Sequence, residues 1–579
     1  MIKQRLDKLR YELKKHNYHG YLIPSGDEYM SEYTPAHAKR LEYMTGFTGS
    51  NGLAIILQDQ ALFFTDGRYI QQSKLQLDKK LLKIYNQNLL LSFDPSDYNI
   101  PSSCKIAYDP SLVNQSQLKL LDKLNLAAHE KNLVDSIWSN QPPRPNSKIY
   151  KYNSNYAGLN ALAKIKSCRK FLSDNDGGQA LLISDPASVC WTLNIRASDV
   201  DYSPILLAYL LVTHDQILLF TNKNRDGISS LNPEIKIKSS ETLKTTLESI
   251  EGKIIFDKNQ SSVFISSIIE KLEYTNKTNP CMIWKSCKNQ DEIRHAQKRH
   301  IEDAVAVCKM LYFLESNDLS STTEHDISIM LTELRSRSKN YISDSFATIC
   351  GFKENGAIIH YKPKKETSKK ISGNGLLLID SGGQYLGATT DITRVIAIGE
   401  IRKEYVEYYT RVLKGHIALA KIKFPHGKVS GAHLDVLARQ YLWELYKDYA
   451  HGTGHGVGNF LSVHEGPQNI GIGTLSTPLQ AGMILSNEPG YYVNNEFGIR
   501  IENLMYVKQE SDNFLGFEML TLVPYAKNLI DFSMLSNEEI LFLKDYYKKI
   551  DSNISPLLSK EEKVWLSWQL KLDSYLNRT

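Results

Sequence analysis

The chain has 579 residues, of which 42% are hydrophobic and 23% are charged, and its formal net charge is +5. One hydrophobic core does not serve a chain of this length, so several domains are expected. The composition is that of a soluble globular protein, and a small net charge without an arginine-rich run gives no reason to expect nucleic-acid binding.

The N-terminal segment and the cysteines bear on where the protein works. Residues 1–23 have no continuous apolar core and no small-residue cleavage site, so no secretory signal is expected. Ile2, Leu6, Leu9 and Leu13 instead predict an amphipathic helix before the strand GYLI. No apolar run approaches the roughly 18 residues of a transmembrane helix. Seven scattered cysteines form no CxxC pair, which predicts reduced thiols in a cytoplasmic protein without a membrane partner.

Short apolar runs that alternate with helical patterns predict an α/β domain over residues 1–145. The runs are GYLIPS, GLAIIL, ALFFTDGRY, LLKIY and KIAYD, and the prolines of NQPPRP mark the end of the domain. Residues 146–288 predict a second α/β domain of the same style. In it, a helix over Tyr156–Ser173 precedes the apolar runs ALLISD, VCWTLNIR, ILLAYLLVT, QILLFT and KIIFD. No sequence repeat relates the two domains.

A long helical pattern from about Gln290 to Glu315 opens a third domain, predicted over residues 289–525, and all the candidate chemistry follows this helix. Six apolar residues share one face of the helix: Ile301, Ala304, Val305, Cys308, Leu311 and Leu314. Residues 526–579 predict a helical C-terminal extension whose default role is packing or an oligomer contact. The predicted fold class is therefore α/β (α+β).

Two pairs of acidic residues stand near the ends of apolar strands in the third domain. Asp380 follows LLLI and, after the turn SGG, a second strand carries Asp391, so both aspartates are expected on neighbouring strands of a hairpin. Glu488 follows the apolar strand MIL, and Glu502 lies in the alternating strand GIRIENLMYV beyond a predicted turn at Asn494–Asn495. Each residue taken alone is more simply a turn residue or a solvated side chain.

Two histidines, His451 and His455, lie four residues apart in HGTGHGVGNF. On a helix this spacing would put both rings on one face. The glycines between and after them argue against a helix, because each costs about 1 kcal/mol there. The stretch therefore predicts a tight strand or loop with close backbone approach, and the two histidines need not have equivalent roles.

Four carboxylates and a glycine-flanked imidazole in one domain predict a metal site. The carboxylates repel one another unless cations compensate their charge, and two divalent metals bridged by carboxylates do this. An oxygen-rich set with one imidazole suits Mn²⁺, with Co²⁺ and Zn²⁺ as alternatives. We take His455 as the imidazole ligand.

The ordered set Asp380, Asp391, His455, Glu488 and Glu502 resembles the dinuclear metal centre of the pita-bread metallopeptidases. The motifs IIHYKP, LLIDSGGQY, TTDITR, HGTGHGVG, VHEGP, NEPGYY and GIRIEN are similar to those of cytosolic-type Xaa-Pro aminopeptidases, also called aminopeptidase P. IPSGDEYMSEY, GFTGSNG, FFTDGRY and LVDSIWSNQPPRP resemble the N-terminal domains of their three-domain form. The resemblance implies two creatinase-like α/β domains followed by a pita-bread catalytic domain, and a homodimer.

The resemblance also implies an activity and a role for each site residue. The protein would remove the N-terminal residue from peptides with proline second, by attack of a hydroxide that bridges two divalent metals on the carbonyl before proline. The five residues of the ordered set would bind the metals, and Glu488 would also accept a proton. The other catalytic or substrate-binding residues would be His360, His451 and His464.

Two arginines are further candidates for the substrate site. Arg500 is expected on the strand face of Glu502, where it would hold a ligand carboxylate and contribute to substrate binding. Arg68 in TDGRY would approach the substrate from the first domain.

Three other functions fit parts of the pattern. A prolidase, specific for dipeptides, has the same metal centre, but the two N-terminal domains and the wording of the motifs favour the aminopeptidase. A non-catalytic pita-bread binding module and a creatinase-like metal-free amidinohydrolase both lack the metal ligands, and all five ligand residues are present here.

Overall fold

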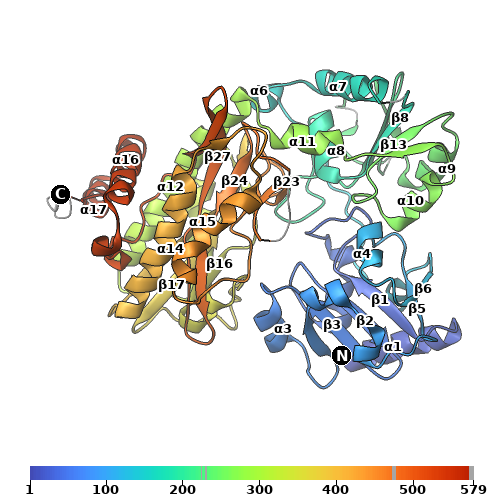
Figure 1. The fold of residues 1–579 in the computed structure, drawn as a ribbon, viewed down its shortest axis with the longest axis horizontal. Coiled ribbons are helices and arrows are strands. Elements are labelled where there is room, and N and C mark those ends of the chain that lie inside the picture. Colours follow the sequence, from blue (N-terminus) through green and yellow to red (C-terminus); the bar gives the residue numbers. More distant parts are fainter. Residues whose placement is uncertain (176, 223, 229–230, 473–476, 573–579) are drawn as a thin grey trace. The chain divides into compact units, whose positions relative to one another are not determined.

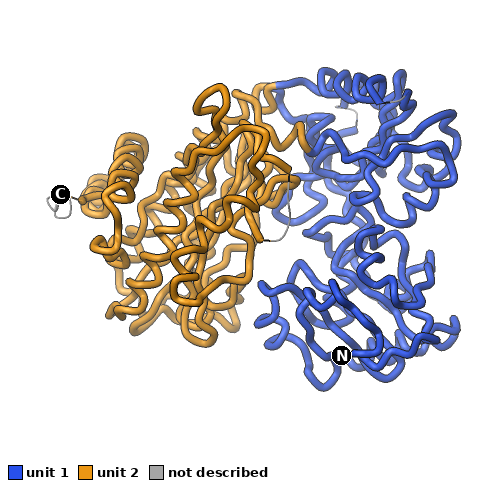
Figure 2. Tube along the Cα trace, in the orientation of Figure 1, with its two compact units in different colours: residues 1–154, 159–282 blue, residues 155–158, 283–579 orange. Residues whose placement is uncertain are grey.

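The computed structural model describes residues 1–175, 177–222, 224–228, 231–472 and 477–572. The chain divides into two compact units, one formed by residues 1–154 and 159–282 and the other by residues 155–158 and 283–579 (Figures 1 and 2). Among the described residues, none of the helices is both long enough and apolar enough to cross a membrane.

The first unit contains two six-stranded mixed sheets. In spatial order, the strands of the first sheet are β4 (Lys83–Asn86), β3 (Ala61–Thr65), β2 (Leu53–Leu57), β1 (Gly20–Pro24), β5 (Lys105–Tyr108) and β6 (Asn125–Ala128). Those of the second sheet are β12 (Ile235–Lys238), β11 (Ile217–Phe220), β10 (Tyr209–Thr213), β8 (Ala180–Ile183), β13 (Ile254–Phe256) and β14 (Tyr274–Asn276). The predicted strands of both α/β domains are thus confirmed in all but one of the apolar runs.

The two sheets have the same strand order and the same strand directions. β1 pairs antiparallel with β2 and parallel with β5, and β8 pairs antiparallel with β10 and parallel with β13. The second domain therefore repeats the topology of the first. The sequence does not show this repeat because strand pairing depends on apolar, pleated surfaces and not on particular residues.

Helices pack against these sheets as the apolar periodicity predicts. α1 (Ile2–Lys15) buries Leu6, Leu9 and Leu13 completely, in a core with α2 (Arg40–Thr45), α5 (Leu133–Ile137) and the sheet. Further α-helices of the first unit are α3 (Ile70–Gln76), α4 (Gln115–Lys119), α9 (Leu243–Glu248) and α10 (Val263–Ile269). α11 (Pro280–Ser286) spans the boundary between the two units.

The single helix expected over Tyr156–Ser173 is wrong. The structure has two helices there, α6 (Ser154–Ala157) and α7 (Ala161–Ser173). Gly158 between them has a φ of +69°, which is left-handed backbone, and the side chain of Asn160 accepts a hydrogen bond from the N–H of Ala163 as an N-cap. A left-handed residue and a new helix start therefore replace the continuous helix.

The run VCWTLNIR is the one apolar run of the second domain that is mostly helical. It lies in α8 (Pro186–Leu193) and ends in the two-residue strand β9 (Ile195–Arg196), which pairs with β7 (Tyr150–Lys151). Asp185 accepts from the N–H groups of Ala187 and Ser188, and proline follows it in the first turn. This cap and proline start a helix despite the apolar composition.

The second unit is built on an antiparallel six-stranded sheet with smaller sheets beside it. The large sheet contains, in spatial order, β21 (Phe424–Pro425), β28 (Phe514–Met519), β27 (Asn503–Ser511), β24 (Ile484–Asn487), β22 (Gly454–Gly456) and β23 (Glu465–Ile470). The smaller sheets contain β16 (Ile349–Phe352), β17 (Gly375–Ser381) and β20 (Ile392–Ile398); β15 (Tyr341–Asp344), β18 (Gly383–Tyr385) and β19 (Ala388–Thr389); and β25 (Gly490–Val493) with β26 (Phe497–Arg500).

Among the described residues, the six α-helices that follow α11 have the bounds α12 (Gln290–Ser316), α13 (Glu324–Ser336), α14 (Lys403–Lys421), α15 (Gly431–Trp443), α16 (Asn537–Ile554) and α17 (Lys560–Gln569). The two helical stretches predicted in this unit are confirmed as α12 and as the C-terminal α16 and α17, whereas α13, α14 and α15 were not predicted from the sequence. On α12, four of the six expected apolar residues are buried, and Ile301 and Val305 are half-buried. The C-terminal extension is helical up to Gln569, and residues 573–579 lie outside the described residues.

Candidate metal centre

The five predicted metal ligands come from five places in the second unit. Asp380 lies near the end of β17, Asp391 directly before β20, His455 in β22, Glu488 directly after β24, and Glu502 between β26 and β27. β17 pairs with β20, while β24 lies between β22 and β27. Strand pairing therefore places the ligand positions on neighbouring strands.

Two local expectations about these strands need correction. The connection from Asp380 to Asp391 is not a simple SGG turn, because β18 and β19 intervene; in another sheet, β18 pairs with β15 on one side and with β19 on the other. Glu502 is not inside one long strand but in the break between β26 and β27. The turn predicted at Asn494–Asn495 is confirmed, with β25 and β26 on either side and a φ of +62° at Asn495.

Glycines bring His455 into position, as the sequence predicts. A Cβ atom at Gly454 would lie 2.0 Å from the carbonyl oxygen of Ser486, and one at Gly456 would lie 2.3 Å from that of Glu465. Only glycine therefore lets β22 pass between its neighbours at this point. The stretch is a short strand within a loop, and not a helix.

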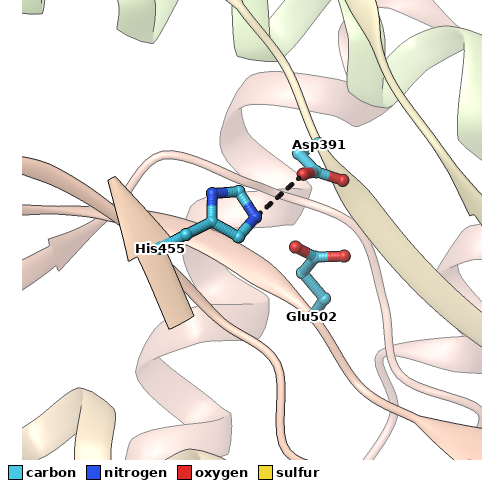
Figure 3. Close-up of side chains that lie close together, drawn as sticks. All are labelled: Asp391, His455 and Glu502. Atoms are coloured by element: carbon cyan, nitrogen blue, oxygen red, sulfur yellow. Dashed lines mark ion pairs between the residues drawn. The ribbon is translucent and has the colours of Figure 1, made fainter. Parts of the chain in front are cut away.

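The imidazole of His455 faces the carboxylates. Potential ligand atoms of Asp391, His455 and Glu502 all lie within 4.8 Å of one another (Figure 3). Nε2 of His455 is 3.5 Å from Oδ2 of Asp391 and 3.5 Å from Oε1 of Glu488. Its Nδ1–H donates to the carbonyl oxygen of Gly456 at 3.0 Å, which leaves Nε2 as the ligand atom.

Arg500 holds Asp380, the aspartate that is not part of this triad. Its Nη2 donates to Oδ2 of Asp380 at 2.6 Å, and its Nε donates to Oγ1 of Thr393 at 3.1 Å. The Thr393 hydroxyl in turn donates to Oε2 of Glu502 at 2.7 Å. Arg500 is 1% exposed, so one buried cation and one hydroxyl connect two of the four carboxylates.

The electrostatics of the site fit divalent cations. Burial raises the pKa of Asp391 and Glu502 well above the ordinary carboxyl range, with neighbouring carboxylates adding to the effect, and burial also raises the pKa of Glu488. Among the described residues, Oδ1 of Asp380 and Oδ1 of Asp391 are buried and accept no hydrogen bond. Bound divalent cations would satisfy these atoms and compensate the clustered charge.

The other predicted histidines lie around this cluster. The ring centroid of His464 is 4.3 Å from that of His455, with the two rings at 70°. Nε2 of His451 lies 2.9 Å from the Tyr492 hydroxyl. His360 is half-buried and follows Ile359, whose carbonyl oxygen accepts from Nη2 of Arg500 at 3.4 Å.

Arg68 belongs to the first unit, where it forms a local ion pair. Its Nε and Nη2 donate to Oδ1 and Oδ2 of Asp66 at 3.0 and 2.8 Å, and the guanidinium lies 5.3 Å from the ring centroid of Tyr69. Its predicted approach to the substrate stays a prediction.

Sequence reasoning missed Tyr492, whose hydroxyl accepts from Nη1 of Arg500 at 2.6 Å. A hairpin centred on Asn494–Asn495 puts Gly490 opposite Arg500, so Tyr492 shares a strand face with Arg500. Strand alternation could therefore have identified it. The role of Thr393 was also not predicted, because no signal in the sequence distinguishes it from the neighbouring threonines.

Family models match almost the whole chain. Residues 291–509 match metallopeptidase family M24, and residues 513–571 match the C-terminal region of peptidase M24. Residues 5–136 and 140–292 each match a creatinase/prolidase N-terminal domain. The fold class is therefore the expected one, with two creatinase-like α/β domains before a pita-bread domain.

Individual relatives are similar over their full length. Xaa-Pro aminopeptidase 1 of Dictyostelium discoideum is 36% identical, with 98% of this chain and 96% of the relative covered. Xaa-Pro aminopeptidase ApepP of Drosophila melanogaster is 36% identical, covering 95% and 94%. The crystal structure of X-prolyl aminopeptidase from Caenorhabditis elegans, described as a cytosolic enzyme with a di-nuclear active site, matches with a TM-score of 0.93, 30% identity, and 99% and 100% of the two chains covered. The chain therefore belongs to the Xaa-Pro aminopeptidases of metallopeptidase family M24.

Proposed function

We propose that the protein removes the N-terminal residue from peptides that have proline in the second position, and that it needs divalent metal to do so. The observation that carries the proposal is the gathering of four carboxylates and the His455 imidazole in a chain similar to Xaa-Pro aminopeptidases over 98% of its length. Family membership makes the protein a hydrolase, and the substrate follows from the names of the relatives.

Five residues would hold two divalent cations, namely Asp380, Asp391, His455, Glu488 and Glu502. When bound there, the cations would supply an activated water molecule and polarise the carbonyl before proline. We propose Mn²⁺, because an oxygen-rich set with one imidazole suits it, with Co²⁺ or Zn²⁺ as alternatives. The di-nuclear site of the Caenorhabditis elegans relative supports the number of cations.

The chain's own groups would move the proton and stabilise charge. Glu488 accepts a hydrogen bond from the Ser486 hydroxyl at 3.1 Å and lies beside His455, which supports a role in which it would take a proton from water and give it to the departing proline nitrogen. His464, against the ring of His455, would donate to the developing oxyanion.

The substrate would be recognised without an N–H group at the scissile bond, because proline has none. We assign His360 and His451 to the pocket for the proline residue. Arg500 is buried and donates to Asp380, Thr393 and Tyr492, so it would act on the substrate through these neighbours. Arg68 is proposed as a contribution of the first domain.

We also propose a homodimer formed through the catalytic domains. α15 exposes Val436 (44%) and Trp443 (40%), which lie two turns apart on one helix face, and Tyr446 (99%) follows the helix. Apolar side chains on one face of a catalytic-domain helix support a contact with a second copy of the chain.

We also propose that the protein is cytoplasmic and that the chain divides into four parts. The seven cysteines are free, which supports the cytoplasm, as does the description of the Caenorhabditis elegans relative as cytosolic. We propose domain boundaries at residues 145, 288 and 525, and the ends of the matched family ranges at 136 and 292 support the first two.

The test compares a peptide that begins Arg-Pro-Pro with the same peptide carrying alanine at the second position. The purified protein is assayed after chelation and again after Mn²⁺ is added, and the products are identified by mass spectrometry. Release of arginine from the proline peptide alone, restored by metal, is expected. Cleavage of Arg-Pro but not of the longer peptide would instead establish a prolidase, and no cleavage with any divalent metal would point to a binding module.

A further inference from the structure

One buried carboxylate outside the metal centre has no role in the proposed mechanism. Glu324 is the first residue of α13 and is 0% exposed. Among the described residues, no lysine, arginine or histidine side chain forms an ion pair with it. A buried charge without a cation is costly unless hydrogen bonds compensate it fully, so its partners show what this residue does.

Every hydrogen bond of the Glu324 carboxylate goes to one segment, residues 352–369. Oε1 accepts from the N–H of Phe352 at 2.7 Å, and Oε2 accepts from the N–H of Lys369 at 2.9 Å. Between these two ends, the amide of Asn355 donates to both oxygens at 2.9 and 3.1 Å, and the Tyr361 hydroxyl donates to Oε2 at 2.9 Å. One carboxylate thus closes a loop of the chain at both ends and in the middle.

The backbone around Glu324 strengthens this closure. Its own N–H donates to the carbonyl oxygen of Lys369 at 3.0 Å, and the N–H of Ile371 donates to that of Thr322 at 2.8 Å. The carboxylate also lies at the N-terminus of a 13-residue helix, where negative charge is favoured. The backbone contacts and the helix therefore fix the position of the carboxylate independently of the hydrogen bonds that it accepts from residues 352–369.

The closed segment leads to the candidate site. Tyr361, held by Glu324, directly follows His360, and Ile359 directly precedes it and accepts from Arg500 at 3.4 Å. Gly356 lies against Gly498 of β26, where a Cβ atom on Gly498 would be 1.8 Å from the Gly356 carbonyl oxygen. His360 is thus fixed between a contact to Glu324 on one side and a contact to Arg500 on the other.

We propose that Glu324 is the positioning residue for His360, and that its charge is required because all its partners are donors. A glutamine would present an NH₂ group to at least one of them, and the two backbone N–H groups cannot become acceptors. The neutral variant therefore opens the segment although it has almost the same shape. This inference rests on the proposed role of His360 in the substrate pocket.

The experiment compares Glu324→Gln with Glu333→Gln, in the metal-loaded full-length protein. Glu333 is an exposed glutamate on the same helix, so it is the matched control. Hydrogen exchange of peptides from residues 353–369 is measured by mass spectrometry, together with kcat and KM for the proline peptide. We expect exchange at least about fivefold faster in Glu324→Gln than in the control, because a buried donor loses its acceptor.

A double-mutant cycle with His360→Ala tests whether Glu324 acts through His360. We expect the loss of kcat/KM in Glu324→Gln to disappear largely in the His360→Ala background, since the group it positions is then absent. Losses that multiply would overturn the proposal, as would equal exchange in the two glutamine variants. If Glu324→Gln does not fold, Tyr361→Phe removes one bond of the same set and is read by the same two measurements.

The two readouts also separate this proposal from the proposed function. If the wild-type protein cleaves no proline peptide, the proposed function fails, and the exchange of residues 353–369 still decides whether Glu324 holds the segment. If the wild type is active and the exchange is unchanged, only the positioning role fails.

Discussion

The hydroxyl oxygen of Tyr492 lies 2.9 Å from Nε2 of His451. The same oxygen accepts from Nη1 of Arg500, whose Nη2 donates to Asp380. Nδ1 of His451 lies 2.8 Å from the carbonyl oxygen of Gly452, so both ring nitrogens are in hydrogen-bonding positions. The Tyr492 hydroxyl thus connects His451, assigned to substrate binding, through Arg500 to Asp380, assigned to metal binding. The orientation of the His451 ring therefore depends on the orientation of the Asp380 carboxylate.

Tyr492→Phe should lower kcat/KM for the proline peptide about fivefold and leave the metal content unchanged. The change removes the hydrogen bond between Tyr492 and His451, which contributes about 1 kcal/mol, and the acceptor of Nη1 of Arg500, while Nη2 of Arg500 keeps its bond to Asp380. Steady-state kinetics and metal analysis of the same sample measure the two quantities. Tyr491→Phe is the control, because that side chain points to the other strand face and stacks on Tyr408. Loss of metal from Tyr492→Phe would contradict the assignment.

Arg500→Lys should weaken metal binding by roughly 10- to 100-fold, since it removes a group that orients ligand carboxylates. A lysine has a single nitrogen and cannot donate to Asp380, Thr393 and Tyr492 in three directions, as Arg500 does. Equilibrium dialysis against Mn²⁺ measures the change. Arg402→Lys serves as the control, because the Arg402 side chain is 50% exposed and its partners are Glu496, at 3.7 Å, and the Tyr405 hydroxyl, neither of which is a proposed ligand. Equal affinities in the two variants would show that Arg500 does not hold the site.

The sequence predicts the ligand residues of this site because their chemistry demands compensation: buried carboxylates and an imidazole at strand ends are costly without cations. It predicts strands from apolar runs and α1 from the spacing of its leucines. It does not predict which strands pair across long separations, so the repeated topology of the N-terminal domains and the break at Glu502 came only from the structure. Residues such as Thr393 and Glu324 carry no signal, because their importance lies in partners distant in the chain.

Metal removal should change how stability depends on pH. In the metal-free protein, burial raises the pKa of Asp391, Glu488 and Glu502 above the ordinary values of 3.8 for aspartate and 4.5 for glutamate. The folded state then binds more protons than the unfolded state, so its stability falls as pH rises through the raised pKa values. Divalent metal competes with these protons and stabilises the deprotonated site.

The increase in Tm on adding Mn²⁺ should therefore grow as pH rises from 5 to 8. Thermal denaturation with and without metal, at several pH values, measures it. Asp391→Asn is the control. It removes a carboxyl group whose pKa is raised and a proposed metal ligand at once, so it should reduce the increase in Tm at every pH. An increase independent of pH would mean that these carboxyls are not the groups that bind metal.

His416 should make the protein less stable in acid. It is buried, its Nδ1 lies 3.0 Å from the carbonyl oxygen of Asn487, and its Nε2 lies 3.0 Å from the Tyr525 hydroxyl. Burial lowers its pKa from 6.5 to about 3, and the nearby Arg394 charge adds to the effect. Between these values the unfolded state binds a proton that the folded state does not, so stability falls as pH falls from 6.5 toward 3.

His416→Gln should flatten this acid dependence by at most one proton, or about 1.4 kcal/mol per pH unit, because glutamine keeps hydrogen-bonding capacity but does not titrate. The measurement is the change in Tm of the second unit between pH 6.5 and pH 4.5, in wild type and variant. His426→Gln, at an exposed position directly after β21, should keep the wild-type dependence. The same dependence of Tm on pH in all three proteins would show that His416 is protonated in the folded state. The ring that contacts Asn487, next to Glu488, would then be charged and not neutral.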